Sequence, residues 1–145
     1  MNLIIVADRG GLKAFKTSKE RDQKSIELLE QFVIEEMLGD FSDKMSDVAG
    51  NFPIDGTAGK GHAASEKMTI KMEHEKRAVK ALIKDIGVVL KKHQPAVWDF
   101  AASSDINGAI LDHLEASFKA HLRHNLKKDL MKTPLGELVS HFEHA

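Results

Sequence analysis

The opening stretch of the chain constrains its fold most. Residues 2–8 read NLIIVAD, an almost unbroken apolar run rich in branched side chains, which is typical of a strand covered on both faces. Arg9, Gly10 and Gly11 follow, and glycine tolerates the positive φ angles of a tight turn. Residues 12–18, LKAFKTS, then alternate as a second strand should. We therefore predict that the chain opens with a β-hairpin.

Length and composition indicate one domain of ordinary soluble type. The chain has 145 residues, of which 42% are hydrophobic and 30% charged, so we expect a single domain over residues 1–145. No stretch approaches the roughly 18 apolar residues of a membrane span, and the N-terminus lacks a signal-peptide pattern. We expect a cytoplasmic protein with no membrane contact. The absence of cysteine excludes disulfides, thiolate zinc sites and cysteine nucleophiles.

The middle of the chain predicts a long loop and then the longest helix. Five glycines and one proline interrupt residues 39–61, which indicates a long Gly-rich loop. From Ala64 to Lys92, apolar residues recur at three- to four-residue steps, which predicts a helix with Ser65 as its N-cap. Residues 93–95, His-Gln-Pro, end this helix, and residues 96–102, AVWDFAA, read as a buried strand.

Two segments fit both a helix and a strand. Residues 25–38 fit either pattern, and propensity alone favours helix slightly. Around residues 118–126 both periodicities fit, and neither decides. Helices are expected over residues 105–117, capped by Ser103 or Ser104, and over residues 134–143. The residues alone thus predict an α/β or α+β fold with helices covering a mixed sheet.

Charge is distributed unevenly along the chain. Residues 27–47 carry seven acidic residues against one lysine, whereas residues 119–132 carry five Lys or Arg against Asp129 alone. A basic segment of this kind can contact phosphate, although a solvated charged face is the commoner explanation. Asp8 and Asp99, near predicted strand ends, could line one edge of the sheet.

The loop before the long helix, GTAGKGHAAS at residues 56–65, has free backbone N–H groups and precedes a helix N-terminus, where a phosphate could bind. It is not a P-loop, because Lys60 is followed by Gly61 rather than Ser or Thr. Lys60 and His62 could supply a charge and a titrating imidazole. The histidine pairs elsewhere lack the carboxylate of HExxH, so we expect no metal and no other cofactor.

Four segments together resemble a known family. They are NLIIVADRGGLKAF at the start, HAAS followed by HEKRAVKAL, WDFAASSDINGAILDHL, and NLKKDLMKTPLGELVSHF at the end. They are similar to the host attachment family, bacterial proteins required for attachment to host cells. This family is related to the middle domain of the eukaryotic and archaeal class I peptide release factor. The resemblance implies strands at about 26–34 and 118–126, and hence a five-stranded, ribonuclease-H-like mixed sheet flanked by helices.

The resemblance also implies a role for the loop. In the release-factor relatives, a Gly-Gly-Gln motif before the long helix helps water attack the ester of peptidyl-tRNA. GKGHAAS occupies the corresponding place, where Gly59 and Gly61 keep the backbone freedom. Lys60 interrupts the glycine pair and His62 stands where Gln is expected, so hydrolytic activity stays an open expectation.

These observations give three functional hypotheses. The leading one is a translation-associated domain that binds ribosomal or transfer RNA, with a possible role in ribosome rescue, through Lys60, Lys67, Lys71, Arg123, Lys127 and Lys128. The second is a non-enzymatic protein-interaction or regulatory module with an indirect role in attachment to host cells. The third is hydrolysis of peptidyl-tRNA with His62 as the catalytic residue.

Overall fold

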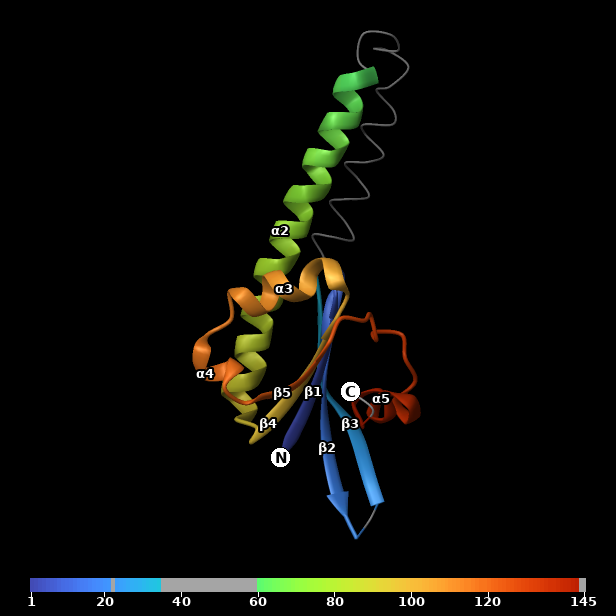
Figure 1. The fold of residues 1–145 in the computed structure, drawn as a ribbon, viewed down its shortest axis with the longest axis vertical. Coiled ribbons are helices and arrows are strands. Elements are labelled where there is room, and N and C mark those ends of the chain that lie inside the picture. The colour runs from blue at the N-terminus through green and yellow to red at the C-terminus, as the bar shows by residue number, and fades with distance from the viewer. Residues whose placement is uncertain (22, 35–59, 144–145) are drawn as a thin grey trace.

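A five-stranded sheet with the strand order β3-β2-β1-β4-β5 forms the centre of the molecule (Figure 1). This computed structural model describes residues 1–21, 23–34 and 60–143, with Glu20 and residues 60–71 described by their backbone only. The strands are β1 (Asn2–Asp8), β2 (Gly11–Glu20), β3 (Gln23–Val33), β4 (Val97–Ala102) and β5 (Leu122–Leu126). β1, β2 and β3 are antiparallel neighbours, whereas β4 runs parallel to β1 and β5 parallel to β4. The mixed sheet and the opening strand pair confirm the predicted α/β class.

Helices cover both faces of the sheet, which is why β1 is apolar along almost its whole length. On one face the sheet packs against α2 (Lys60–His93) and α3 (Ser104–Asp112). The buried side chains of that layer include Leu3, Ile5, Leu82, Ile86, Trp98, Phe100 and Ile106. The opposite face packs against α5 (Leu135–Glu143) and the residues before it. This smaller layer comprises Ile4, Val6, Phe15, Ala101, Leu130, Leu138 and Phe142.

The segment from residue 25 is a strand, so the slight preference for helix based on propensity was wrong. β3 pairs with β2 along its length, from Gly11 opposite Val33 to Glu20 opposite Gln23. A strand gains a full ladder of hydrogen bonds only when a partner strand is present, and local propensity does not register that partner. The strand that the family resemblance implied at about residues 26–34 is confirmed.

The longest helix begins earlier than predicted. α2 starts at Lys60 rather than at Ala64, so Lys60, Gly61 and His62 belong to its first turn and not to a loop. Gly61 disfavours helix by about 1 kcal/mol, but its neighbours propagate the helix past it. Gly59 and the rest of the predicted loop lie outside the described residues. Among the described helices, none is both long and apolar enough to cross a membrane.

The C-terminal third contains more, shorter elements than predicted. The helix expected over residues 105–117 is divided into α3 and a single turn, α4 (Ala116–Lys119), and the strand after it begins at Leu122 rather than at residue 118. One interaction accompanies the turn, a hydrogen bond that Trp98 Nε1 donates to the carbonyl oxygen of Phe118 at 2.8 Å. Ser103 occupies the N-cap position of α3, but its hydroxyl bonds to Asp105 rather than to a backbone N–H.

Candidate functional site

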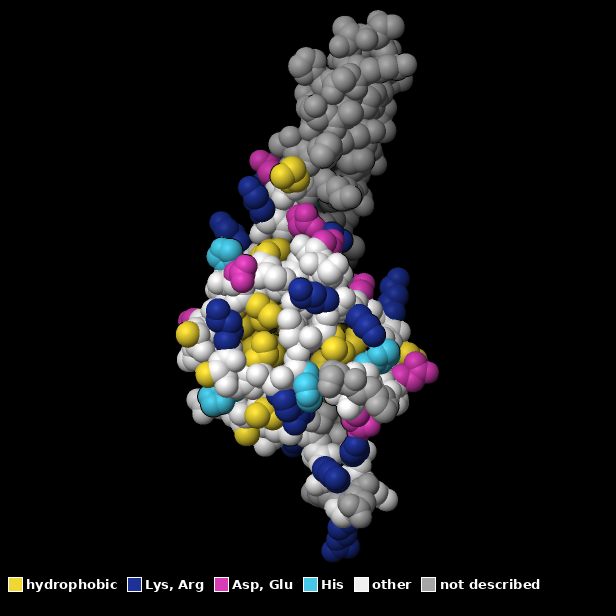
Figure 2. All heavy atoms as spheres, viewed as in Figure 1, with side chains coloured by type: hydrophobic (Ala, Val, Ile, Leu, Met, Phe, Trp, Pro, Cys, Tyr) yellow, Lys and Arg dark blue, Asp and Glu magenta, His cyan; other side chains and the backbone are white. Residues whose placement is uncertain are grey.

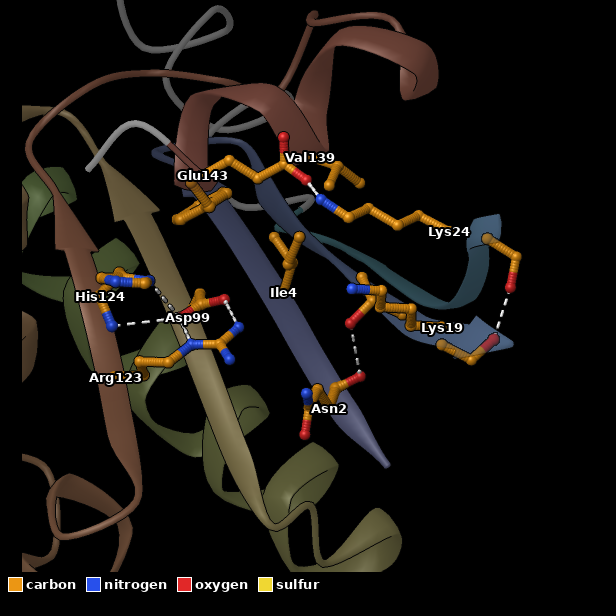
Figure 3. A pocket seen from close by; sticks show the side chains of 13 residues that line it. Asn2, Ile4, Lys19, Lys24, Asp99, Arg123, His124, Val139 and Glu143 are labelled. Carbon is orange, nitrogen blue, oxygen red and sulfur yellow. Dashed lines mark hydrogen bonds and ion pairs between the residues drawn. The ribbon is translucent and has the colours of Figure 1, made fainter. Parts of the chain in front are cut away.

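A pocket of about 290 Å³ lies on the face of the sheet that carries α5 (Figure 3). Its walls come from all five strands and from the last residues of α5. The lining side chains that carry charge are Lys19, Lys24, Asp99, Arg123, His124 and Glu143. The pocket therefore brings together charged residues that are more than 100 positions apart in the sequence.

Asp99 is the buried acid of this pocket. It alternates along β4 with Trp98 and Phe100, which face α2, so its carboxylate points to the α5 side, where it is 1% exposed. Arg123 donates from Nε to Oδ1 at 3.1 Å and from Nη2 to Oδ2 at 2.8 Å. The backbone N–H of His124 donates to Oδ1 at 3.1 Å. These bonds satisfy a carboxylate whose burial would otherwise be costly.

The charge of Arg123 is fixed by this arrangement. Its hydrogen bonds to Asp99 raise the pKa of the guanidinium above its usual value, an effect larger than the opposing effect of burial. The side chain stays 44% exposed, while that of Asp99 is 2% exposed. Arg123 is thus a permanently charged group with one side held by the protein and the other side open to solvent.

A register irregularity explains why two consecutive residues reach the same carboxylate. Trp98 pairs with Leu122, whereas Phe100, two residues later, pairs with Asn125, three residues later. The extra residue on β5 is a bulge, which breaks the usual alternation of side chains. As a result, the Nδ1 atom of His124 also approaches Oδ1 of Asp99, at 3.2 Å, although it does not meet hydrogen-bond geometry.

A second charged cluster lies where β1 ends. Arg9 donates to Oε1 of Glu75 from Nε at 2.9 Å and from Nη2 at 2.6 Å, and it also pairs with Asp105. It thereby connects the end of β1 to α2 and to α3. Asp8 accepts a hydrogen bond from the backbone N–H of Gly10, whereas Asp99 lies beside Ile4 in the sheet interior. The two aspartates therefore do not line one edge together.

The residues predicted to bind nucleic acid fall into two groups. Arg123 lies in the pocket, and Lys127 and Lys128 are exposed directly after β5. Lys60, Lys67 and Lys71 lie in the N-terminal part of α2, which projects beyond the sheet (Figure 1). Ala78, which is fully buried in the core, lies eighteen residues after Lys60, or about 27 Å along the helix. The structure therefore does not gather all six residues at one place.

Sequence reasoning missed Lys19, Lys24 and Glu143 as pocket residues. One signal did point to the site, because Asp99 is the only charged residue in the strand AVWDFAA, and a buried carboxylate requires a partner. Nothing in the sequence identified that partner as Arg123, since the bulge is a property of strand pairing. Within the described residues, no three His, Asp or Glu side chains are grouped so as to hold a metal ion.

Fold and pocket define a small mixed α/β protein with one five-stranded sheet, helices on both faces and a charged pocket opposite its longest helix. The chain belongs to the family described as "Protein required for attachment to host cells", whose model matches residues 3–142. No curated protein and no solved structure matches the chain significantly. The resemblance to the host attachment family is thus confirmed over nearly the full length.

Proposed function

We propose that the protein is a translation-associated, release-factor-like domain that binds ribosomal or transfer RNA through the phosphate backbone. The observation that carries the proposal is the group formed by Arg123, Lys127 and Lys128 at the end of β5. All three side chains are exposed. None of the ion pairs among the described residues includes Lys127 or Lys128, and both exposed ammonium groups can contact phosphate.

The distribution of basic side chains supports an extended ligand. Figure 2 shows Lys and Arg side chains spread over the visible face of the molecule, with hydrophobic side chains exposed between them. Phosphates follow one another at regular intervals along a nucleic acid, so several cations on one face can each contact a phosphate.

The position of α2 also supports a release-factor-like role. Its first turn, with Lys60, Gly61 and His62, lies at the end of the helix that projects away from the sheet (Figure 1). In the family resemblance this is the place of the Gly-Gly-Gln motif. Hydrolysis of peptidyl-tRNA stays a prediction, which comparison of turnover by wild type and His62→Ala tests directly.

Co-sedimentation with ribosomes over a salt series tests the proposal. We expect binding that weakens steeply as salt rises, because each phosphate contact releases counterions. The double variant Lys127→Glu, Lys128→Glu should lower the slope of log K against log salt by roughly 1.4–1.8, the value for two lost contacts. Lys80→Glu, Lys84→Glu is the matched control, since both lysines are exposed on α2 and the charge change is equal. The proposal is contradicted if binding does not change with salt concentration. It is also contradicted if the two double variants weaken binding equally.

A second candidate function follows from the family description and from the edge strand β3. A protein-interaction module with an indirect role in attachment needs an exposed surface, and β3 exposes Leu28 at 44% and Val33 at 56%. Affinity capture after ribonuclease treatment separates this candidate from the first. A discrete protein retained by wild type and lost by Leu28→Lys, Val33→Lys would favour it, whereas loss of all captured material after ribonuclease would favour RNA binding.

A further inference from the structure

Two lysines face each other across the β2–β3 hairpin, at the rim of the pocket. Lys19 pairs with Lys24 in the strand register, so their side chains leave the same face of the sheet. Like charges directly opposite each other are destabilising unless other groups offset them. Lys24 is offset by an ion pair with Glu143 of α5. Lys19 lines the pocket and has no carboxylate partner among the residues whose side chains the structure describes.

Arg123 faces Lys19 from the opposite side of the pocket. Figure 3 shows the two side chains directed toward the pocket from opposite walls, with Ile4 between them. A guanidinium has five N–H donors, and Asp99 uses two of those of Arg123. Three donors therefore remain for a ligand, on a group that Asp99 holds in place.

The remaining lining adds hydrogen-bonding groups and limits the size of a ligand. Asn2 contributes a side-chain amide and Thr17 a hydroxyl group, which donates to the carbonyl oxygen of Asn2. The volume of about 290 Å³ falls just below the range of roughly 300–1,000 Å³ that is typical of sites for drug-sized molecules. A small, strongly charged group with several acceptor oxygens fits such a site better than a large apolar ligand does.

We propose that this pocket binds a phosphate monoester group, with Lys19 and Arg123 as its two charge partners. A phosphate monoester carries a charge of about −1.5 to −2 and three acceptor oxygens, which can accept from the Lys19 ammonium, the three remaining donors of Arg123 and the Asn2 amide. A carboxylate offers two acceptor oxygens rather than three, so it would satisfy fewer of the donors that Lys19 and Arg123 present. The proposal goes beyond backbone binding, because the RNA backbone is a diester. Monoesters occur at the phosphorylated end of an RNA chain and in free mononucleotides, and these two sources share the same chemistry.

Titration of the ¹⁵N-labelled protein with adenosine 5′-monophosphate, inorganic phosphate and adenosine tests the pocket directly. We expect the two phosphates to shift amide signals of β2, β3 and β5 around Lys19, Lys24 and Arg123, and adenosine to leave them unchanged. Lys19→Met should weaken the affinity for the monophosphate at least about tenfold. Lys16→Met is the control, because Lys16 lies on the same strand opposite Leu3, on the other face, and should bind as wild type does.

A second arm identifies the source of the phosphate. A 5′-phosphorylated RNA that binds more tightly than its 5′-hydroxyl counterpart, with the preference lost in Lys19→Met, would support an RNA end as the ligand. Equal binding of the two RNAs, together with monophosphate binding in the pocket, would support a free mononucleotide. If no RNA binds, the proposed function is refuted, and the titration with adenosine 5′-monophosphate then tests the pocket by itself. The inference would be overturned if adenosine bound as tightly as adenosine 5′-monophosphate does, or if Lys19→Met kept the wild-type affinity for the monophosphate.

Discussion

At the scale of single residues, Asp99 and Arg123 form an ion pair that joins the sheet interior to the pocket. The carboxylate is buried, and its partners are the guanidinium and the backbone N–H of His124. The guanidinium is nearly half exposed and can turn to water if the acid is removed. The two partners therefore differ in what their removal leaves behind.

We predict that Arg123→Met destabilises the fold more than Asp99→Asn does. Arg123→Met leaves a buried charge without its main partner, which costs about 3–5 kcal/mol in comparable cases. Asp99→Asn leaves a solvent-accessible guanidinium and should cost about 1–3 kcal/mol. Urea denaturation at pH 7 measures both values. A larger loss for Asp99→Asn would show that the buried carboxylate does not depend on Arg123.

Gly11 gives a second prediction at this scale. A Cβ atom at Gly11 would lie 2.1 Å from the carbonyl oxygen of Phe32 in β3, and backbone cannot give way as a side chain can. At Gly10 the nearest atom would be 3.4 Å away, in the side chain of Asp8. Gly11→Ala should therefore destabilise the protein by about 1–3 kcal/mol, and Gly10→Ala by less than about 1 kcal/mol. Thermal and urea unfolding of both variants decide the matter, and equal losses would contradict the close approach of β2 and β3.

At the scale of elements, the sequence was most informative where a segment carries its own signal. The apolar run of β1 and the periodicity of α2 each predict one structure. In β1 the continuous run indicates burial on both faces, and in α2 the three- to four-residue spacing indicates burial along one stripe. β3 and the start of β5 depend on partner strands, and their residues fit a helix as well. The bulge opposite Asp99 is a property of pairing alone, so the network around that carboxylate could not be predicted.

β3 and α2 are connected at the C-terminal end of the helix. Glu30 of β3 accepts a hydrogen bond from Nζ of Lys92 at 3.0 Å, and its other oxygen lies 3.1 Å from Nε2 of His93. The hydrogen bond to Lys92 is the main cause that lowers the pKa of Glu30 below its usual 4.5, and the contact with His93 also lowers it. The charged carboxylate thus favours the folded state.

We predict that the cost of Glu30→Gln depends on pH. Because the pKa of Glu30 is lower in the folded than in the unfolded state, its stabilisation is present above the unfolded value and is lost as pH falls through the lowered folded value. Glu30→Gln should cost at most about 1 kcal/mol at pH 7, since Lys92 is exposed, and the difference from wild type should shrink as the pH is lowered toward pH 3. Denaturant unfolding between pH 7 and pH 3 measures this trend. Glu27→Gln, an exposed position on the same strand, is the control, and a cost independent of pH would contradict the prediction.

At the scale of the whole molecule, the sheet separates the two regions that we propose to contact RNA. α2 covers one face and extends past the sheet with Lys60, Gly61 and His62 at its start, while the pocket with Arg123 opens on the other face (Figure 1). The basic segment after β5 was predictable from charge clustering in the sequence. Its relation to Asp99 and to Lys19 was not, because only the folded sheet brings these residues to one pocket.

Mapping of RNA contacts by ¹⁵N NMR tests the central claim most directly. An unstructured RNA oligonucleotide should shift the amide signals of β5, of residues 127–128 and of the first turns of α2, and added salt should reverse these shifts. Signals from the middle of α2, around Leu82 and Ile86, should stay unchanged because those residues are buried against the sheet. Absence of shifts at low salt, or shifts confined to α3 and the middle of α2, would contradict RNA binding by the basic residues.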